Sequence, residues 1–368
     1  MISSSSYYST ASPQEMKRPS DPRPSSSVIL LSPTNQVLLL HRVKTSSAFP
    51  SAHVFPGGNL SEFHDGSVEP PGHPRRHQDS LPYRLGAIRE TFEESGILLA
   101  RDGHGTRLLN LPLADRDEAR KAVYANKVPF GTWLESVGGY ADTANLIPFT
   151  RWITPPATPK RFTTQMYLYM LPLPTPLSAD PACAAAQAEA ILPTPDGSEV
   201  TVSVFEDAQT WLQRQAMGEI ILFPPQAFLL TLVAQFCTGP PSSLSADSTL
   251  HYKAQRDALL QFLDTLPTTS HPKVLKNPTS HIPWSEKVIC PATAMMAGDG
   301  RIVLSLDKPG PELRGRGHGG DFERVVLVKF ERGGPRRVEV RRREEVFEEE
   351  RRRLEGNEEY GRARQFKL

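Results

Sequence analysis

The chain has 368 residues, enough for one large domain or two ordinary ones. Its 42 basic and 41 acidic residues give a formal net charge of +1, which argues against a general nucleic-acid-binding protein. The three cysteines show no Cys-x-x-Cys spacing, so neither a disulfide framework nor a cysteine zinc site is expected. No apolar run reaches the roughly 18 residues of a membrane span. These features predict a soluble intracellular protein with no nucleic-acid or membrane partner, and they leave its oligomeric state open.

The N-terminal part of the chain predicts a disordered segment followed by a hairpin. Residues 1–27 are rich in serine and proline, a composition typical of disorder. Two apolar runs, 28–31 and 37–40, flank a polar turn and predict two buried strands. Arg42 follows the second run, where it either faces substrate phosphates or lies in solvent at the end of the strand.

A third short strand, Val54-Phe55, leads into Pro56-Gly57-Gly58. Paired glycines permit a tight turn with positive φ and a close approach of the backbone to a ligand. The residues that follow, 65–80, are polar and proline-rich and predict a surface loop. This loop either lies in solvent or covers the substrate and contributes Arg75 or Arg76 to a phosphate.

The segment 81–100 predicts an amphipathic helix. Gly96 supplies its C-cap, because glycine readily adopts the left-handed conformation in which helices end. Apolar residues at helical spacing form a stripe that is expected to face the core: Leu81, Leu85, Ile88 and Phe92.

Three carboxylates, Glu90, Glu93 and Glu94, gather on the opposite side of this helix. Carboxylates so close together repel one another, and without a counter-charge their pKa values rise. A hard divalent cation such as Mg²⁺ removes that penalty, because it prefers oxygen ligands. The helix therefore admits two interpretations, a solvated acidic surface or a metal site.

Two motifs together resemble the signature of the Nudix hydrolases: Pro56-Gly57-Gly58 and Arg89-Glu90-Thr91-Phe92-Glu93-Glu94-Ser95-Gly96-Ile97. Thr91 stands where the family usually has an aliphatic residue. The glycine and the arginine are about 17 residues further apart than in the family, so the loop between them carries an insert. The resemblance implies an α/β fold in which a mixed β-sheet lies between helices.

The resemblance also implies the roles of the acidic residues and glycines. Glu93 and Glu94 are expected to bind Mg²⁺ or Mn²⁺, and Glu90 to complete the site or to orient the attacking water. Gly57 and Gly58 are expected to hold their loop against the helix.

In the family, the arginine of the signature anchors the loop through an ion pair with an upstream glutamate. Arg89 is that arginine in this chain. The usual position of the glutamate falls on His64, so Asp65 or Glu62 is expected to take its place.

A longer set of motifs resembles the peroxisomal or mitochondrial-type coenzyme A diphosphatase branch of this family. The motifs are residues 51–58, Arg151-Trp152-Ile153-Thr154-Pro155 followed by Arg161-Phe162, and residues 218–225. This resemblance implies hydrolysis of coenzyme A or acyl-coenzyme A to 3′,5′-ADP and 4′-phosphopantetheine or its acyl form. Peroxisome, mitochondrion and cytoplasm all stay open as locations.

Other functions compete with this one. An ADP-ribose or NAD(H) pyrophosphatase would carry the same signature helix, and a catalytically silent binding module would retain the fold. A third alternative is an interaction protein built around the charged C-terminal tail. Glu219, a carboxylate beside an apolar run, is a candidate general base from outside the helix.

The remaining composition predicts how the chain is divided. The hydrolase domain is expected to span 28–237, with inserts at about 65–80 and 172–198. A linker with an amphipathic segment is expected at 238–280, a strand-rich extension at 281–340, and a charged helical tail at 341–368.

Overall fold

The computed structural model describes residues 19–43, 51–105, 107–173, 189, 191–195, 200–241 and 248–365, with side chains of the last helix to residue 355. Within these residues, no helix combines the length and the apolar character that a membrane span requires.

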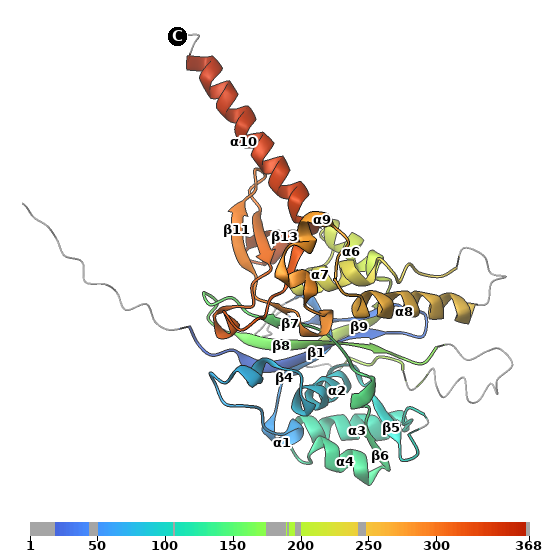
Figure 1. Ribbon diagram of the computed structural model, residues 1–368. Coiled ribbons are helices and arrows are strands. Elements are labelled where there is room, and N and C mark those ends of the chain that lie inside the picture. The colour runs from blue at the N-terminus through green and yellow to red at the C-terminus, as the bar shows by residue number, and fades with distance from the viewer. Residues whose placement is uncertain are drawn as a thin grey trace, which may run out of the picture.

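An eight-stranded mixed sheet forms the centre of the molecule, as expected for the fold (Figure 1). Its main order is β10-β7-β8-β1-β2-β3, with β4 paired to β1 and β9 paired to β2. The β1–β8 and β10–β7 pairs are parallel and the others antiparallel. The strands are β1 Arg23–Leu31, β2 Val37–Arg42, β3 His53–Val54, β4 Gly57–Asn59, β7 Ile147–Ile153, β8 Phe162–Met170, β9 Val200–Glu206 and β10 Val288–Ile289.

Both faces of this sheet are covered, which explains why the second half of β1, residues 28–31, is a continuous apolar run. In β1, Val28 and Leu30 belong to one core, and Ile29 and Leu31 belong to the other. The first face is covered by α1 Glu62–Asp65, the 3₁₀ turn η1 Pro74–His77, α2 Leu81–Ser95, α3 Leu113–Tyr124, α4 Phe130–Ser136 and the small β5–β6 pair, Ala100–Asp102 with Gly139–Ala141 (Figure 1).

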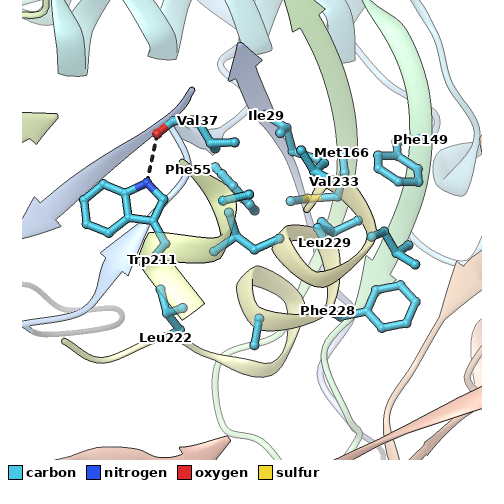
Figure 2. Close-up of a cluster of buried hydrophobic side chains, with 14 of the residues drawn as sticks. Ile29, Val37, Phe55, Phe149, Met166, Trp211, Leu222, Phe228, Leu229 and Val233 are labelled. Carbon is cyan, nitrogen blue, oxygen red and sulfur yellow. Dashed lines mark hydrogen bonds between the residues drawn. The ribbon is translucent and has the colours of Figure 1, made fainter. Parts of the chain in front are cut away.

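The opposite face is covered by α6 Ala208–Ala216, α7 Pro224–Val233 and α8 Ser248–Asp264. Figure 2 shows Phe228 and Leu229 of α7 among the buried side chains of this core. In the same view the indole Nε1 of Trp211 donates to the carbonyl of Val37 at 2.9 Å, which satisfies the one polar atom of that buried ring.

A second, four-stranded antiparallel sheet follows in the chain: β11 Ala292–Met296, β12 Ile302–Leu306, β13 Asp321–Glu331 and β14 Gly334–Arg342. Leu306, Val326 and Val338 of this sheet share one hydrophobic core with α7 and α8. The region predicted as linker and extension therefore packs on the side of the central sheet that α7 covers. The last helix, α10 Arg343–Gln365, projects away from the body (Figure 1). The short turns are η2 Thr143–Asn145, α9 Pro272–Leu275, η3 Pro278–His281, η4 Trp284–Glu286 and η5 Pro311–Leu313.

Three local predictions require correction. Strand β1 begins at Arg23, so residues 23–27 pair with β8 and β4 instead of belonging to a disordered segment. Pro56-Gly57-Gly58 is not only a turn, because Gly57–Asn59 forms β4 against β1. The 65–80 insert is not wholly a solvent loop: it contains η1, and its Asp65 and His77 are only 3% and 4% exposed. Most of the predicted 172–198 insert lies outside the described residues.

The predicted helix forms as α2 and ends where expected, since Gly96 is its C-cap with φ 72°. Ile88 and Phe92 of the predicted stripe are buried, but Leu81 is 59% exposed. Leu81 is the first residue of the helix, and this end of the helix lies outside the core. Tyr83 and Ala87 are buried on the same helix and extend the apolar face.

Candidate active site

The acidic side of α2 is organised by Arg89. Its guanidinium donates from Nε to Asp65 Oδ1 at 2.9 Å and from Nη2 to Asp65 Oδ2 at 2.8 Å. Both residues are buried, so this two-point ion pair is protected from water. Of the two acids that the sequence offered as partners, the structure selects Asp65, which lies at the end of α1.

The remaining donors of Arg89 bind the elements that surround the acidic residues. Nη1 donates to Glu90 Oε1 at 2.9 Å and to Glu93 Oε1 at 3.1 Å, while Nη2 also reaches the carbonyl of Asn59 at 2.9 Å. One arginine thus fixes the end of β4 and orients two of the three carboxylates. Because Nη1 contacts both, Glu90 and Glu93 lie next to each other.

Glu90 lies against the backbone of Gly58. A Cβ atom at position 58 would be 2.5 Å from the carboxyl carbon and Oε2 of Glu90, so the carboxyl group could not keep this position beside any other residue. Burial raises the pKa of Glu90 to about 7, with repulsion from Glu93 adding to the effect and Arg89 opposing it. A carboxylate in this setting is stabilised by an added positive charge, which is the chemistry expected of a metal ligand.

Glu94 fastens the glycine loop to the helix. Its Oε2 accepts from the backbone N–H of Gly57 at 2.9 Å, and its Oε1 accepts from Arg42 Nη1 at 3.1 Å. A Cβ at Gly57 would lie 2.2 Å from the carbonyl of Ser26, so only glycine permits this approach. The expected role of Gly57 and Gly58, holding the loop against the helix, matches this geometry.

The C-terminal end of α2 is held from α3. Arg120 donates to the carbonyl of Glu93 from Nη2 at 2.8 Å, and it also binds Thr194 Oγ1 from Nη1 at 3.0 Å. A Cβ on Gly96 would lie 2.4 Å from that Thr194 oxygen. Gly96 therefore serves both to end the helix and to admit this close contact.

His64 has a role that the sequence did not indicate. Its Nε2 lies 2.8 Å from Asn126 Oδ1, and its Nδ1 accepts from the backbone N–H of Phe130 at 3.2 Å. The residue at the usual place of the family's glutamate thus ties α1 to the connection between α3 and α4. Only tertiary structure reveals this contact, because the partners are more than 60 residues away.

The candidate metal ligands do not form a closed cage. In the ranges that the structure describes, no three His, Cys, Asp or Glu side chains are grouped closely enough to hold a metal ion. Glu90 and Glu93 share Arg89 Nη1, whereas Glu94 faces Gly57. The donor set is nevertheless all carboxylate oxygen, which suits Mg²⁺ or Mn²⁺.

The structure does not bring Glu219 to this group of carboxylates. Its side chain is 50% exposed and accepts from Arg214 Nε at 3.2 Å, while Arg214 Nη1 also pairs with Glu206 at 2.7 Å. Arg214 belongs to α6, which covers the face of the sheet opposite to α2. The described contact of Glu219 is therefore an ion pair at the surface, away from the carboxylates of α2.

Two curated proteins are similar to this chain in sequence. No family model matches the chain. The acyl-coenzyme A diphosphatase NUDT19 of Gallus gallus is 27% identical over 339 residues, which cover 79% of this chain and 82% of that protein. The chain is a relative of the Nudix hydrolases. Nudix hydrolase 7 of Caenorhabditis elegans is also 27% identical, over 214 residues that cover 58% of this chain and 61% of that protein.

Two solved structures resemble this Nudix hydrolase relative. A NUDIX hydrolase from Alicyclobacillus acidocaldarius is 24% identical with a TM-score of 0.42, covering 58% of this chain and 90% of that one. The MutT protein from Methanosarcina mazei Go1 is 15% identical with a TM-score of 0.25, covering 54% and 85%. The first of the two curated relatives is named as a diphosphatase and the second as a nudix hydrolase.

Proposed function

We propose that this Nudix relative is a metal-dependent hydrolase of coenzyme A or acyl-coenzyme A, with 3′,5′-ADP and 4′-phosphopantetheine or its acyl form as products. The observation that supports hydrolysis is the arrangement around Arg89, which orders Glu90 and Glu93 beside the Gly57-Gly58 loop. The similarity to an acyl-coenzyme A diphosphatase across most of both chains supports the substrate.

The metal would be held by Glu90, Glu93 and Glu94. When bound, Mg²⁺ or Mn²⁺ neutralises charge on the diphosphate and orients the water that attacks phosphorus. Glu90 and Glu93 are neighbours already, and Glu94 would join them by releasing its contact with Gly57 or with Arg42.

The chain's own groups prepare the site for an anionic substrate. Arg89 holds the carboxylates in place, and its pair with Asp65 prevents it from turning away. Arg42, at the end of β2, is the cation beside Glu94 and supplies a positive charge for the diphosphate. Glu90 completes the site or orients the attacking water. Glu219 pairs with Arg214 away from these carboxylates, so it is not proposed as the base.

A substrate panel separates this proposal from its rivals. Purified protein is incubated with Mg²⁺ or Mn²⁺ and with coenzyme A, an acyl-coenzyme A, ADP-ribose and NADH, and the products are identified by mass. Coenzyme A species are expected to be cleaved fastest. Preference for ADP-ribose or NADH would replace the substrate assignment, and no turnover of any of them would support a silent binding module.

Glu93→Gln tests the assignment of the site, with Glu219→Gln as its matched control. The first substitution removes a charged metal ligand and is expected to lower kcat/KM roughly a hundredfold or more. The second removes a carboxylate from an exposed pair and is expected to leave turnover unchanged. Equal activity of Glu93→Gln and the unsubstituted protein would show that α2 does not bind the metal.

A further inference from the structure

A group of buried donors without acceptors lies beside the N-terminal end of α2. The guanidinium groups of Arg151 in β7 and Arg161, which precedes β8, are only 2% and 3% exposed. Each has an Nη2 that forms no hydrogen bond, and the Nε of Arg76 in η1 is buried and unpaired in the same way. Buried N–H groups without partners are rare and costly, so three in one place point to an absent acceptor.

His77 adds a fourth donor to this group. Arg151 Nη1 donates to Thr163 Oγ1 at 3.2 Å, and the same hydroxyl lies 3.0 Å from His77 Nδ1. Because the hydroxyl accepts from the arginine, its single proton is directed to Nδ1, and the proton of the neutral ring then resides on Nε2. Burial lowers the pKa of His77 to about 4, and repulsion from Arg151, Arg76 and Arg161 contributes, which agrees with a neutral ring.

The local charge balance is positive. Arg151 lies 4.3 Å from the centre of the Tyr83 ring and has no carboxylate partner among its described contacts. Arg161 has one, since its Nη1 reaches Glu312 Oε1 at 2.6 Å. Three arginines thus face one paired carboxylate, a surplus that an anion would offset.

Three distant parts of the chain build this group of donors. Arg76 and His77 come from the insert between Gly58 and α2, and Arg151 and Arg161 come from the central sheet. Glu312 belongs to the segment between β12 and β13, and His318 from the same segment also contributes to the repulsion at His77. The insert and the segment between β12 and β13 therefore meet at one point.

The distance from the buried donors to the acidic face of α2 is one that a single nucleotide can span. Arg151 pairs with Gln165, Gln165 with Ser26, and Ser26 with Gly58, which lies against Glu90. Three strand spacings separate the two ends, about 14 Å. Along α2, the seven residues from Tyr83 to Glu90 span about 10 Å.

We propose that Arg76, His77, Arg151 and Arg161 form a phosphoryl-anion subsite that binds a phosphate monoester of the substrate while its diphosphate lies at the acidic face of α2. The assignment rests on the proposed function, because coenzyme A carries such a phosphate on the ribose of its 3′,5′-ADP part. The guanidinium groups bind a phosphate through their positive charge and through hydrogen bonds from their planar N–H groups. The subsite thereby selects substrates that carry the extra phosphate.

A comparison of coenzyme A with dephospho-coenzyme A tests this subsite. These substrates differ only in the monoester, so the ratio of their kcat/KM values measures its recognition. The unsubstituted protein is expected to prefer coenzyme A, and Arg151→Gln is expected to reduce that preference about tenfold or more, mainly through KM. Dephospho-coenzyme A turnover should change little. An equal loss for both substrates, or an unchanged ratio, would overturn the proposal.

His318→Gln provides a second variant, because His318 is only partly buried and its loss should not prevent folding. It is expected to lower the same ratio by a smaller factor, about threefold, since His318 lies near His77 but is not one of the unpaired donors. Arg332→Gln, in the exposed turn between β13 and β14, is the matched control that also removes one arginine. Its ratio should equal that of the unsubstituted protein.

Binding of inorganic phosphate and of 3′,5′-ADP without metal separates this inference from the proposed function. Both ligands are expected to raise the melting temperature of the unsubstituted protein, 3′,5′-ADP more strongly, and both shifts are expected to vanish in Arg151→Gln. If no substrate in the panel is hydrolysed but these shifts occur, the subsite stands and the proposed reaction fails. If hydrolysis occurs without either shift and without substrate preference, the subsite fails alone.

Discussion

Arg89 and Asp65 form a buried two-point ion pair, with N–O distances of 2.8 and 2.9 Å, across 24 residues of sequence. The chain between them holds the insert, so the pair closes a loop longer than the family's signature requires. The same guanidinium orients Glu90 and Glu93. Stability and the geometry of the acidic face therefore depend on one interaction.

Asp65→Asn is expected to affect both properties. Losing the charge leaves Arg89 buried without its main partner, which costs about 3 kcal/mol of unfolding free energy. Hydrolysis should fall at least about tenfold, because the carboxylates lose their fixed orientation. Urea unfolding and steady-state kinetics measure the two effects. Glu62→Gln, on the exposed side of α1, is the control, and a matching loss in that variant would contradict the assignment.

Gly58→Ala should remove activity with a smaller effect on folding. The new methyl group would lie about 2.5 Å from the carboxyl group of Glu90, so that side chain must turn away. Turnover is expected to fall about a hundredfold. Gly131→Ala in α4 is the matched control, since its added Cβ meets no atom within 4 Å and should leave turnover unchanged. Full activity of Gly58→Ala would show that hydrolysis does not require Glu90 in the position seen here.

Acid should destabilise the protein through His53. Burial lowers its pKa to about 4, and His41 and Arg214 add repulsion. Between about pH 6.5 and pH 4 the unfolded chain therefore binds more protons at this site than the folded chain, and the free energy of unfolding falls as the pH falls. The full effect is at most about 3 kcal/mol.

His53→Gln isolates this contribution. Unfolding free energies of the two proteins, measured by urea at pH 7, 6 and 5, should differ by an amount that changes with pH, with the unsubstituted protein losing more stability in acid. Parallel curves would show that the ring is accessible and titrates normally in the folded state. The comparison also cancels the opposite effect of Glu90, whose raised pKa is common to both proteins.

Much of the fold follows from local sequence patterns. The β1–β2 hairpin and α2 form where the apolar periodicity predicts them, and Gly96 ends the helix as expected. These features depend on residues within a few positions of one another. The mixed α/β sheet expected from the family resemblance is also confirmed.

The sequence could not show which distant side chains meet. Asp65 was one of two candidate partners for Arg89, and only the geometry of α1 decides between them. The sequence predicts a surface loop around His77 that either lies in solvent or covers the substrate, yet His77 is buried against Thr163, which lies 86 residues away. The roles of Arg151 and Arg161 emerge for the same reason, because their unpaired donors are a property of tertiary packing.

The assignment of individual site residues depends most directly on metal binding by α2. Titration of Mn²⁺ into the protein, followed by its electron paramagnetic resonance signal, measures that binding without turnover. The unsubstituted protein should bind Mn²⁺ and then cleave coenzyme A to 3′,5′-ADP, while Glu93→Gln should bind it at least about tenfold more weakly. Equal Mn²⁺ affinity in the two proteins, together with equal release of 3′,5′-ADP, would contradict the account.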